Sequence, residues 1–474
     1  MEMKVTAMVA DSGGLRLIRS EPNVWQISPD ADVLADLDTD DFWTATPVLQ
    51  RVRQFARSRR VGPYSMLGVA LVKATSSIPP YVVLPPTRGS YGSLNLYVAL
   101  VGPSGTTKST SMAAGRDYLR TVPNVPVSQP GSGEGLAKCF AYVSGKGSAR
   151  VQEGSAWSVI GFVPEVASML QTASRGGATL MADWRSGWSG ERLGKDYADD
   201  GKRVVIMDHR YRLTYVLGVV PMLAKELFDG AHVGTPQRIL WMPTSDPNCP
   251  RTPPEAPKRR VLNEWPSRTP DRVHGADREV ALCAVLDQPV QAAEFETLQL
   301  PTLVTDLIDE QAVTALSRDL ADDAEENHDL FNQLKVAAAI MRLHKRTTNV
   351  TETDWQLAGH LLAISTGLRD ETQRLISTTT YRQQVKAAHV QGKLADAVSS
   401  AQDHQALRRV RALLQRYLIE AGGEMSSSDL RNRLSSRDRE PYYDSAIGRL
   451  QADGLIERKP IQYNGIDGHQ IRLV

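Results

Sequence analysis

Short apolar runs alternate with helical periods over the first half of the chain. An uninterrupted apolar run of four to eight residues is typical of a strand buried on both faces, as in a parallel sheet. Amphipathic or apolar helical periods occupy residues 47–57, 64–75 and 111–119, between the strands and before them. We therefore predict an α/β core with a parallel sheet. Its strands are expected at Tyr97–Val101, Asn124–Ser128, Ser155–Glu165, Leu213–Val220 and Ile239–Met242, and a short strand at Tyr81–Leu84 precedes them.

Helical periods dominate the second half, from Arg278 to about Gln402. The strongest is Leu330–His344, and Thr351 with Asp354 three residues later forms the pattern of a capped helix start. The last seventy or so residues carry a different pattern. Helices are predicted at 407–418, from a serine cap at Ser426, and at 442–452, followed by strands at 455–459 and 469–474.

These patterns divide the chain into five parts. The predicted order is an N-terminal arm at 1–41, an α/β core at 42–244, a Pro- and Arg-rich linker at 245–279, a helical lid at 280–403 and a small domain of helices and strands at 404–474. The linker segment is alternatively an extended arm across a neighbouring subunit, and its basic cluster at 258–260 either contacts phosphates or is simply solvated.

Composition is that of an ordinary folded soluble protein, with 41% hydrophobic and 23% charged residues among 474. Because the formal net charge is only +1, nucleic-acid contacts are expected from local patches. Cys139, Cys249 and Cys283 form no paired motif, so we expect reduced thiols and no zinc site. No apolar stretch approaches a membrane span and no signal pattern begins the chain, which predicts a cytoplasmic protein without a membrane partner.

The run Tyr97–Val101 leads directly into a phosphate-loop pattern. Such a loop curls backbone N–H groups around a triphosphate at a helix N-terminus. Lys108 is expected to reach the β- and γ-phosphates of ATP, and the Ser109 hydroxyl to bind Mg²⁺. Thr107 stands where the motif has glycine. The predicted nucleotide-binding residues are Gly102, Pro103, Ser104, Gly105, Thr106, Thr107, Lys108, Ser109 and Thr110.

Two further residues are candidates for catalysis. Glu165 ends an apolar strand some fifty residues after the loop, where a carboxylate orients the attacking water, and Pro164 occupies the place of the usual metal-binding aspartate. Arg238 directly precedes the strand Ile239–Met242. An arginine at that point can reach a γ-phosphate, either of its own chain or of a neighbouring subunit.

Two segments are candidates for DNA contact. A polar, glycine-punctuated stretch at 190–203 predicts a β-hairpin whose tip carries Lys195, Tyr197, Lys202 and Arg203, which either grip single-stranded DNA or are merely solvated. The C-terminal segment strongly resembles a winged helix, a module that binds DNA or other proteins. The resemblance implies a recognition helix bearing Tyr442, Tyr443, Ser445 and Arg449, and a wing bearing Arg458, Lys459 and Tyr463.

The order of parts resembles the phosphate-loop helicase domains in replication proteins of phages, plasmids and integrated elements, which are related to superfamily 3 and AAA+ ATPases. The motifs that carry it are Leu94–Val98 before the loop, Glu165, Leu217–Pro221, and the Gly234–Ile239 element with Arg238. The resemblance implies an ATP- and Mg²⁺-dependent motor on DNA, working as a homo-oligomeric, hexameric ring. No primase motif is visible, so a priming or initiator protein would be a separate chain.

Two functions remain open from the sequence. The first is an ATP-dependent DNA helicase or translocase in the replication of a phage, plasmid or integrated mobile element. The second is an ATP-regulated origin initiator or repressor with little turnover. Thr107, Pro164 and Val220 favour the second, because each replaces a group that a fast ATPase uses.

Overall fold

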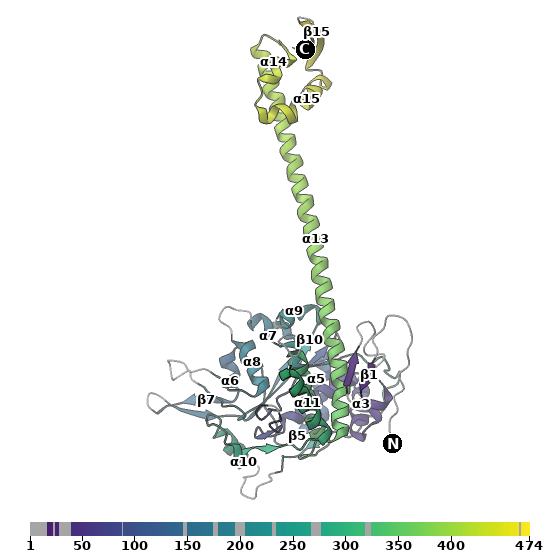
Figure 1. Cartoon of the computed structure of the whole chain (residues 1–474), viewed down its shortest axis with the longest axis vertical. Helices are drawn as coiled ribbons and strands as arrows, with labels where there is room; N and C mark the ends of the chain where they lie inside the picture. Colours follow the sequence, from purple (N-terminus) through teal and green to yellow (C-terminus); the bar gives the residue numbers. More distant parts are fainter. Residues whose placement is uncertain are drawn as a thin grey trace. The chain divides into compact units, whose positions relative to one another are not determined.

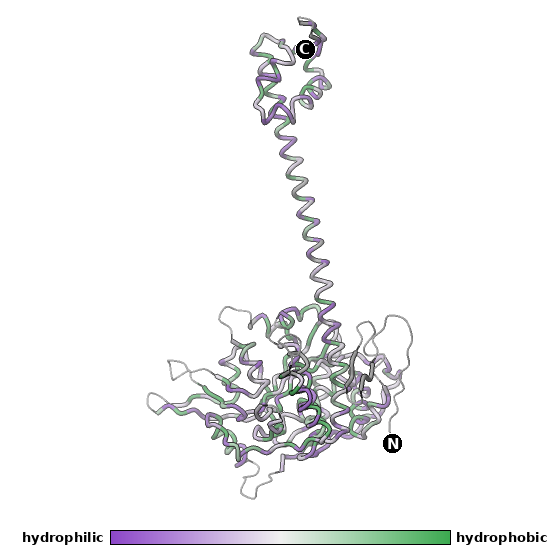
Figure 2. Tube along the Cα trace, in the orientation of Figure 1, coloured by the Kyte–Doolittle hydropathy of each residue, from purple (hydrophilic) through white to green (hydrophobic). Residues whose placement is uncertain are grey.

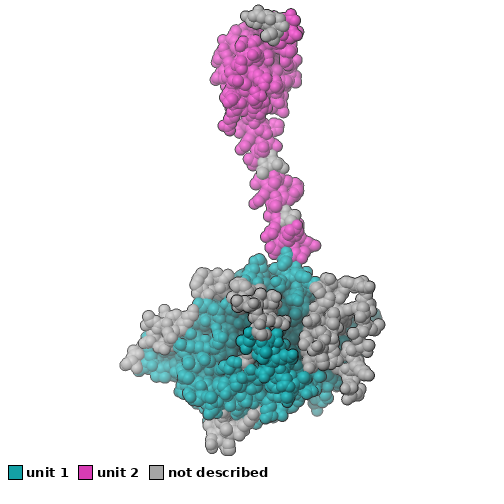
Figure 3. Space-filling model, in the orientation of Figure 1, with its two compact units in different colours: residues 1–377 teal, residues 378–474 magenta. Residues whose placement is uncertain are grey.

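The computed structural model describes residues 17–21, 24–27, 39–87, 89–145, 149–173, 179–194, 204–229, 234–266, 276–317, 324–463 and 466–474. The chain forms two compact units, residues 1–377 and 378–474 (Figure 3). The first contains the predicted nucleotide-binding core, and the second contains the predicted DNA-binding module. Each is described by itself.

The centre of the first unit is a parallel sheet of five strands (Figure 1). Its strands, in spatial order, are β11 (Ile239–Pro243), β4 (Tyr97–Val101), β10 (Arg212–Val219), β9 (Ser158–Val163) and β6 (Val127–Ser128). Every residue of β4, β9, β10 and β11 is buried, which explains why their sequences are mostly apolar. The polar residues among them are Ser158, Arg212 and Thr214, which are also buried. The predicted α/β class and parallel sheet are confirmed, and they are compatible with a P-loop NTPase core.

Smaller strands and helices surround this sheet. The helices are α2 (Asp40–Thr44), α3 (Pro47–Ser58), α4 (Pro63–Ser76), α5 (Lys108–Tyr118), α6 (Gly133–Lys138), α7 (Val166–Ala173), α8 (Leu180–Ser189), α9 (Lys225–Asp229), α10 (Ala276–Cys283) and α11 (Thr302–Ser317). The paired strands are β1 (Leu17–Glu21) with β2 (Val24–Ile27), β3 (Val82–Val83) with β13 (Glu296–Thr297), β5 (Leu119–Thr121) with β12 (Arg260–Leu262), and β7 (Ala141–Ser144) with β8 (Val151–Gly154). Three-residue 3-10 turns occur at Pro221–Leu223, Pro236–Arg238 and Ala292–Glu294.

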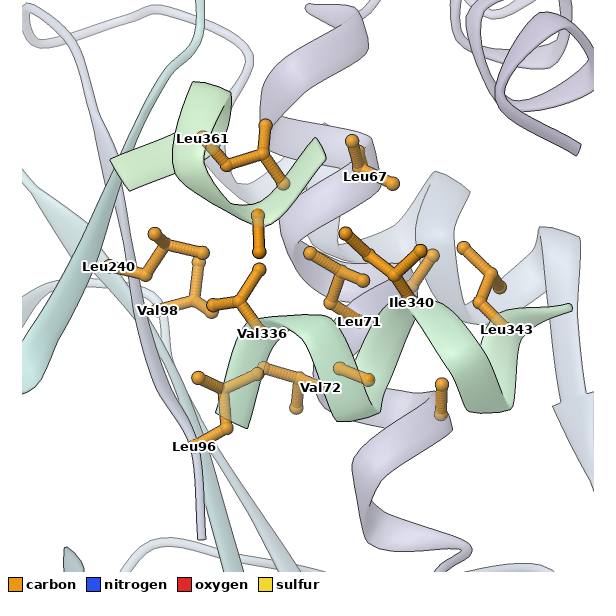
Figure 4. Close-up of a cluster of buried hydrophobic side chains, with 14 of the residues drawn as sticks. Leu67, Leu71, Val72, Leu96, Val98, Leu240, Val336, Ile340, Leu343 and Leu361 are labelled. Carbon is orange, nitrogen blue, oxygen red and sulfur yellow. The ribbon is translucent and has the colours of Figure 1, made fainter. Parts of the chain in front are cut away.

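The helices expected to form a separate lid are part of the main core. In α12 (Ala324–Leu343), Val336 and Ile340 pack with Leu71 of α4 and with Val98 of β4 in one buried cluster (Figure 4). The expected boundary at 279/280 therefore does not separate two domains, because residues on both sides of it share one hydrophobic core.

The other predicted boundaries also shift. Helix α13 (Glu352–Glu420) runs without interruption for 69 residues, so the boundary at 403/404 falls inside a helix. Beyond the first unit, hydrophilic and hydrophobic residues intermingle along it (Figure 2). The boundary at 41/42 likewise lies inside α2.

The expected linker is held against the first unit. Its proline-rich segment, residues 246–259, lies along α3 through an ion pair of Arg57 with Asp246 at 2.9 Å, a hydrogen bond from Gln54 to the Glu255 carbonyl, and hydrogen bonds from Arg60 to two of its carbonyls. Strand β12 then follows. These side-chain contacts and the pairing of β12 with β5 fix the segment in place. A solvated linker would have no such contacts.

The second unit follows the end of α13. It continues through β14 (Glu424–Ser426), α14 (Ser427–Asn432), α15 (Ser436–Ala452), β15 (Ile456–Tyr463) and β16 (Ile466–Leu473). The strands form an antiparallel sheet in the order β14-β16-β15. The predicted serine cap is present, since the Ser426 hydroxyl accepts a hydrogen bond from the Asp429 N–H. A small core of its own includes Val410, Leu414 and Ile447.

Candidate nucleotide-binding site

The phosphate loop connects the buried strand β4 to the first turn of α5. Residues 103–106 are exposed, whereas Gly102 is buried at the end of the strand. Gly105 has φ +79°, a left-handed conformation that favours glycine. Thr107 has φ −72°, which any residue adopts, so threonine at the position usually held by glycine does not strain the loop.

Lys108 is folded back into its own loop. Its Nζ donates to the carbonyls of Gly102 at 2.9 Å and Pro103 at 2.6 Å, and lies 3.3 Å from the Thr106 hydroxyl. Burial lowers the pKa of Lys108, and the Glu165 carboxylate opposes that shift. The ammonium group thus lies inside the loop, and the negative charge of Glu165 acts on its pKa.

Thr244 is a contact of the loop that the sequence motif did not indicate. It follows β11, and its hydroxyl donates to the Val101 carbonyl at 3.1 Å and lies 3.4 Å from the Thr106 hydroxyl. A Cβ on Gly102 would come within 2.0 Å of the Thr244 hydroxyl oxygen. Only glycine therefore fits at 102. The available signal was a polar residue immediately after an apolar strand.

Glu165 lies at the same edge of the sheet as the loop. Strand β10 separates β9 from β4, and the three strands are parallel, so their carboxyl ends meet at one edge. Gly218 permits a close approach there, because a Cβ on it would lie 1.9 Å from the Pro164 carbonyl oxygen. The Glu165 side chain is exposed to solvent. Gly218 is thus a second residue that positions the site.

The residues at this edge suit Mg²⁺ together with a nucleotide. Ser109 offers an exposed hydroxyl in the first turn of α5, and Glu165 offers a carboxylate. Oxygen ligands of this kind, completed by phosphate oxygens and water, are what Mg²⁺ takes at phosphate-loop sites. A cavity of about 270 Å³, lined by Ser109, Gln129 and Pro164 among others, lies beside them. Pro164 contributes no ligand, so Glu165 is the one acidic side chain among the predicted site residues.

Arg238 lies at the amino-terminal ends of the strands, whereas the phosphate loop lies at their carboxyl-terminal ends. Ile239, the residue after it, pairs with Tyr97 at the start of β4, and the loop begins five residues later. At about 3.3 Å per residue the separation is about 16 Å along the strand. Within one chain, Arg238 therefore does not reach the phosphates. Its guanidinium donates to the Gly234 carbonyl at 2.8 Å and lies over the Trp188 ring at 5.4 Å.

The environment of Arg238 is crowded with cations. Burial lowers its pKa, and Arg185 lowers the pKa further. Lys335 is fully buried nearby, where its Nζ donates to the Trp188 carbonyl at 2.7 Å and lies 3.4 Å from the centre of the Trp188 ring. Burial also lowers the pKa of Lys335 well below its usual range.

The predicted DNA-contacting residues have different outcomes. Lys195, Tyr197, Lys202 and Arg203 lie outside the described residues, although the antiparallel bridge between Leu193 and Ile206 is present at the base of the expected hairpin. The C-terminal residues lie in the second unit.

Tyr443 is not a surface residue. It is 3% exposed in the core of the second unit, and its hydroxyl donates to the Ser427 carbonyl at 2.8 Å, so the prediction that it faces DNA is wrong. Tyr442 is partly exposed and donates to Asp403 at 2.7 Å. Arg449, on the same helix, is exposed.

The two basic residues of β15 are both exposed. Arg458 lies 3.1 Å from His469 of β16, and Lys459 lies 3.2 Å from Glu457. Arg449, Arg458 and Lys459 are therefore available to a ligand on the surface of the second unit.

Comparisons with known proteins add little to this geometry. No protein-family profile matches the chain, and no curated protein sequence does. Among solved structures, a full-length MCM homologue from Methanopyrus kandleri matches 72% of this chain and 62% of that protein, with 11% sequence identity and a TM-score of 0.32. The match thus spans less than two thirds of that protein. The function proposed below rests on the chain's own residues.

Among the described residues, no helix combines the length and the apolar content that crossing a membrane requires.

Proposed function

We propose that this chain is an ATP-dependent DNA motor, a helicase or translocase that acts in the replication of a phage, plasmid or integrated element. The observation that carries the proposal is the placement of Lys108 and Glu165 at the same end of the parallel sheet. Lys108 lies inside a phosphate loop at the start of α5, and Glu165 follows β9, which β10 joins in parallel to β4. A phosphate-binding cation and a water-orienting carboxylate are two of the groups that ATP hydrolysis uses, together with Mg²⁺.

Each residue has a defined task in this proposal. Lys108 exchanges its loop carbonyls for the β- and γ-phosphates, and loop N–H groups hold the phosphate oxygens. Glu165 accepts a proton from, and orients, the attacking water. Bound Mg²⁺, held through Ser109, neutralises phosphate charge. Arg238, which cannot serve its own loop, acts on the nucleotide of the next subunit in a hexameric ring.

DNA is held by the second unit and by the 190–203 segment. The order helix, strand, two helices and two strands, with the sheet order β14-β16-β15, supports a winged helix in which Arg449, Arg458 and Lys459 face DNA. Lys195, Tyr197, Lys202 and Arg203 are proposed to contact the single strand, where a basic residue beside an aromatic ring suits a phosphate and a base.

The test is ATP hydrolysis with and without single-stranded DNA. We expect turnover that rises several-fold with DNA and is abolished by Lys108→Ala. Glu165→Gln should retain ATP binding while turnover falls by about 100-fold or more, the typical contribution of a general base. A wild-type chain without turnover above that of Lys108→Ala would contradict the proposal.

A specific observation favours the second candidate, an ATP-regulated initiator or repressor. Lys108 already has acceptors in the Gly102 and Pro103 carbonyls, and Pro164 replaces a metal-binding carboxylate. Tight ATP binding with no hydrolysis, together with DNA binding that changes with ATP, would support this candidate over the motor.

A further inference from the structure

A cluster of basic side chains, here called the basic patch, lies at the far end of α5 from the phosphate loop. Helix α5 runs away from the loop for 11 residues and leads directly into β5, which pairs with β12. The patch is therefore separate from the nucleotide site by about 16 Å of helix. Its members are Arg51, Arg59, Arg120, Lys258, Arg259, Arg260 and Lys345.

Contacts between these segments bring the members of the patch together around the β5–β12 ladder. Arg260 pairs with Leu119 on the inner face of this ladder, and its Nε donates to the Leu343 carbonyl at 2.8 Å, close to Lys345. Arg120 lies on the opposite, exposed face, beside Val261. Burial lowers the pKa of Arg260, Tyr118 raises it, and Arg51 lowers it, so Arg51 of α3 is near the same point.

Asp117 joins two further members, and Lys258 is the neighbour of one of them in the chain. Arg259 lies 2.8 Å from one of its oxygens, and Arg59 lies 3.1 Å from the other. Four segments distant in sequence, namely α3, the end of α5 with β5, the proline-rich segment with β12, and the end of α12, thus bring their cations together.

The patch has a large excess of unpaired positive charge. Asp117 is the one carboxylate that forms an ion pair with its seven members in the described part of the chain. Arg51, Arg120, Lys258 and Lys345 are exposed and form no ion pair with any described residue. For a chain of formal net charge +1, such a concentration must be balanced by acidic residues elsewhere. It is therefore a local feature of the surface.

From these observations we infer that the basic patch binds the sugar-phosphate backbone of DNA, as a second DNA-binding surface apart from the C-terminal unit. Arginine and lysine side chains free of carboxylate partners release counterions from a phosphate backbone without first breaking an ion pair. The proline-rich segment is fixed to α3 through Arg57, Gln54 and Arg60. Lys258 and Arg259 are therefore presented on a tethered backbone, which reduces the entropy lost on binding.

This inference takes DNA as the ligand from the proposed function, but it does not require ATP hydrolysis. Its test measures binding of labelled single-stranded and duplex DNA by fluorescence anisotropy over a range of salt concentrations, without nucleotide. The variant Arg120→Ala/Lys258→Ala removes two exposed cations without removing any ion pair. The matched control Lys138→Ala/Lys225→Ala removes the same charge from α6 and α9, where each lysine pairs with a carboxylate.

We expect the patch variant to bind DNA about tenfold or more weakly at moderate salt, regardless of DNA sequence, and the control to bind like wild type. The slope of log affinity against log salt should fall by about 1.8 if duplex is the ligand and about 1.4 if a single strand is. The same loss should appear on a background of Arg449→Ala/Arg458→Ala, which weakens the C-terminal surface.

Equal affinity and equal slope for the patch variant and the wild type would overturn the inference. The inference would also be overturned if the patch variant bound DNA like the wild type but no longer bound vesicles of phosphatidylcholine and phosphatidylserine. That result would assign the patch to anionic lipid. The ATPase measurement is independent of both outcomes. If the chain does not hydrolyse ATP, the motor proposal fails, but the DNA-binding measurement still tests the basic patch.

Discussion

At the scale of single residues, the fit between Gly102 and Thr244 governs the phosphate loop. We expect Gly102→Ala to weaken ATP binding by at least about tenfold, equivalent to about 1.4 kcal/mol, because its Cβ would lie 2.0 Å from the Thr244 hydroxyl oxygen and displace the loop. Binding of a fluorescent ATP analogue measures the effect, and an unchanged thermal unfolding midpoint shows that the fold persists.

Thr244→Ala provides the control for that mechanism. Combined with Gly102→Ala, it removes the closest clashing atom, so the double variant should bind ATP more tightly than Gly102→Ala alone. Such coupling is expected only between residues in contact. Simple addition of the two losses would show that Gly102 acts through backbone freedom and not through the close approach.

His209 makes stability depend on pH. Burial, with a smaller contribution from Arg212, lowers its pKa from 6.5 to about 4. The unfolded chain therefore binds a proton below about pH 6.5 that the folded chain does not bind until about pH 4. Stability is complete above pH 6.5 and is lost as the pH falls toward 4, by about 2 kcal/mol between pH 8 and pH 5.

Urea unfolding at these two pH values tests the linkage. His209 has φ +55°, so His209→Asn is the suitable variant, since asparagine tolerates the left-handed region and does not titrate. The variant should be less sensitive to acid by about the same 2 kcal/mol. An equal loss of stability in variant and wild type would assign the acid sensitivity to other groups.

At the scale of elements, the sequence predicts a helix or strand correctly when the contacts that define it are local in sequence. The strands were predictable because burial on both faces leaves an uninterrupted apolar run, and Thr351 with Asp354 was recognisable as a capping box, which is present with the Thr351 N–H donating to Asp354 at 2.8 Å. The length of α13 was not predictable, because helical periods reach about Gln402 and resume at 407, and nothing local shows that the two stretches form one helix.

The pairing of strands and the packing of helices also cannot be predicted from local sequence patterns. Arg238 was a candidate for its own γ-phosphate until the pairing of Ile239 with Tyr97 placed it at the other edge of the sheet. Tyr443 and Tyr442 are adjacent and chemically alike, yet Tyr443 is buried, because only the packing of α15 on the second unit's core decides which ring faces inward. Thr244 entered the site for the same reason, through strand pairing and not through a motif.

At the scale of the whole molecule, the first unit includes helices that the sequence pattern assigned to a separate lid. Ile340 of α12 is 1% exposed in the same cluster as Leu71 and Val98 (Figure 4). Replacing it with alanine should leave a cavity in the core that contains the central sheet. We expect Ile340→Ala to lower the free energy of unfolding of the first unit by about 3 kcal/mol.

Tryptophan fluorescence reports on this unit alone, because all eight tryptophans lie before residue 378. Denaturant unfolding followed by this signal should therefore shift in Ile340→Ala. It should not shift in the control Leu316→Ala, an apolar truncation at a side chain that is 87% exposed on α11. If α12 were a lid over an independent core, both variants would unfold like the wild type. A shift only in Ile340→Ala would mean that the sheet bearing the phosphate loop and helix α12 unfold as one cooperative unit, so that any ligand which stabilises the loop should stabilise α12 as well.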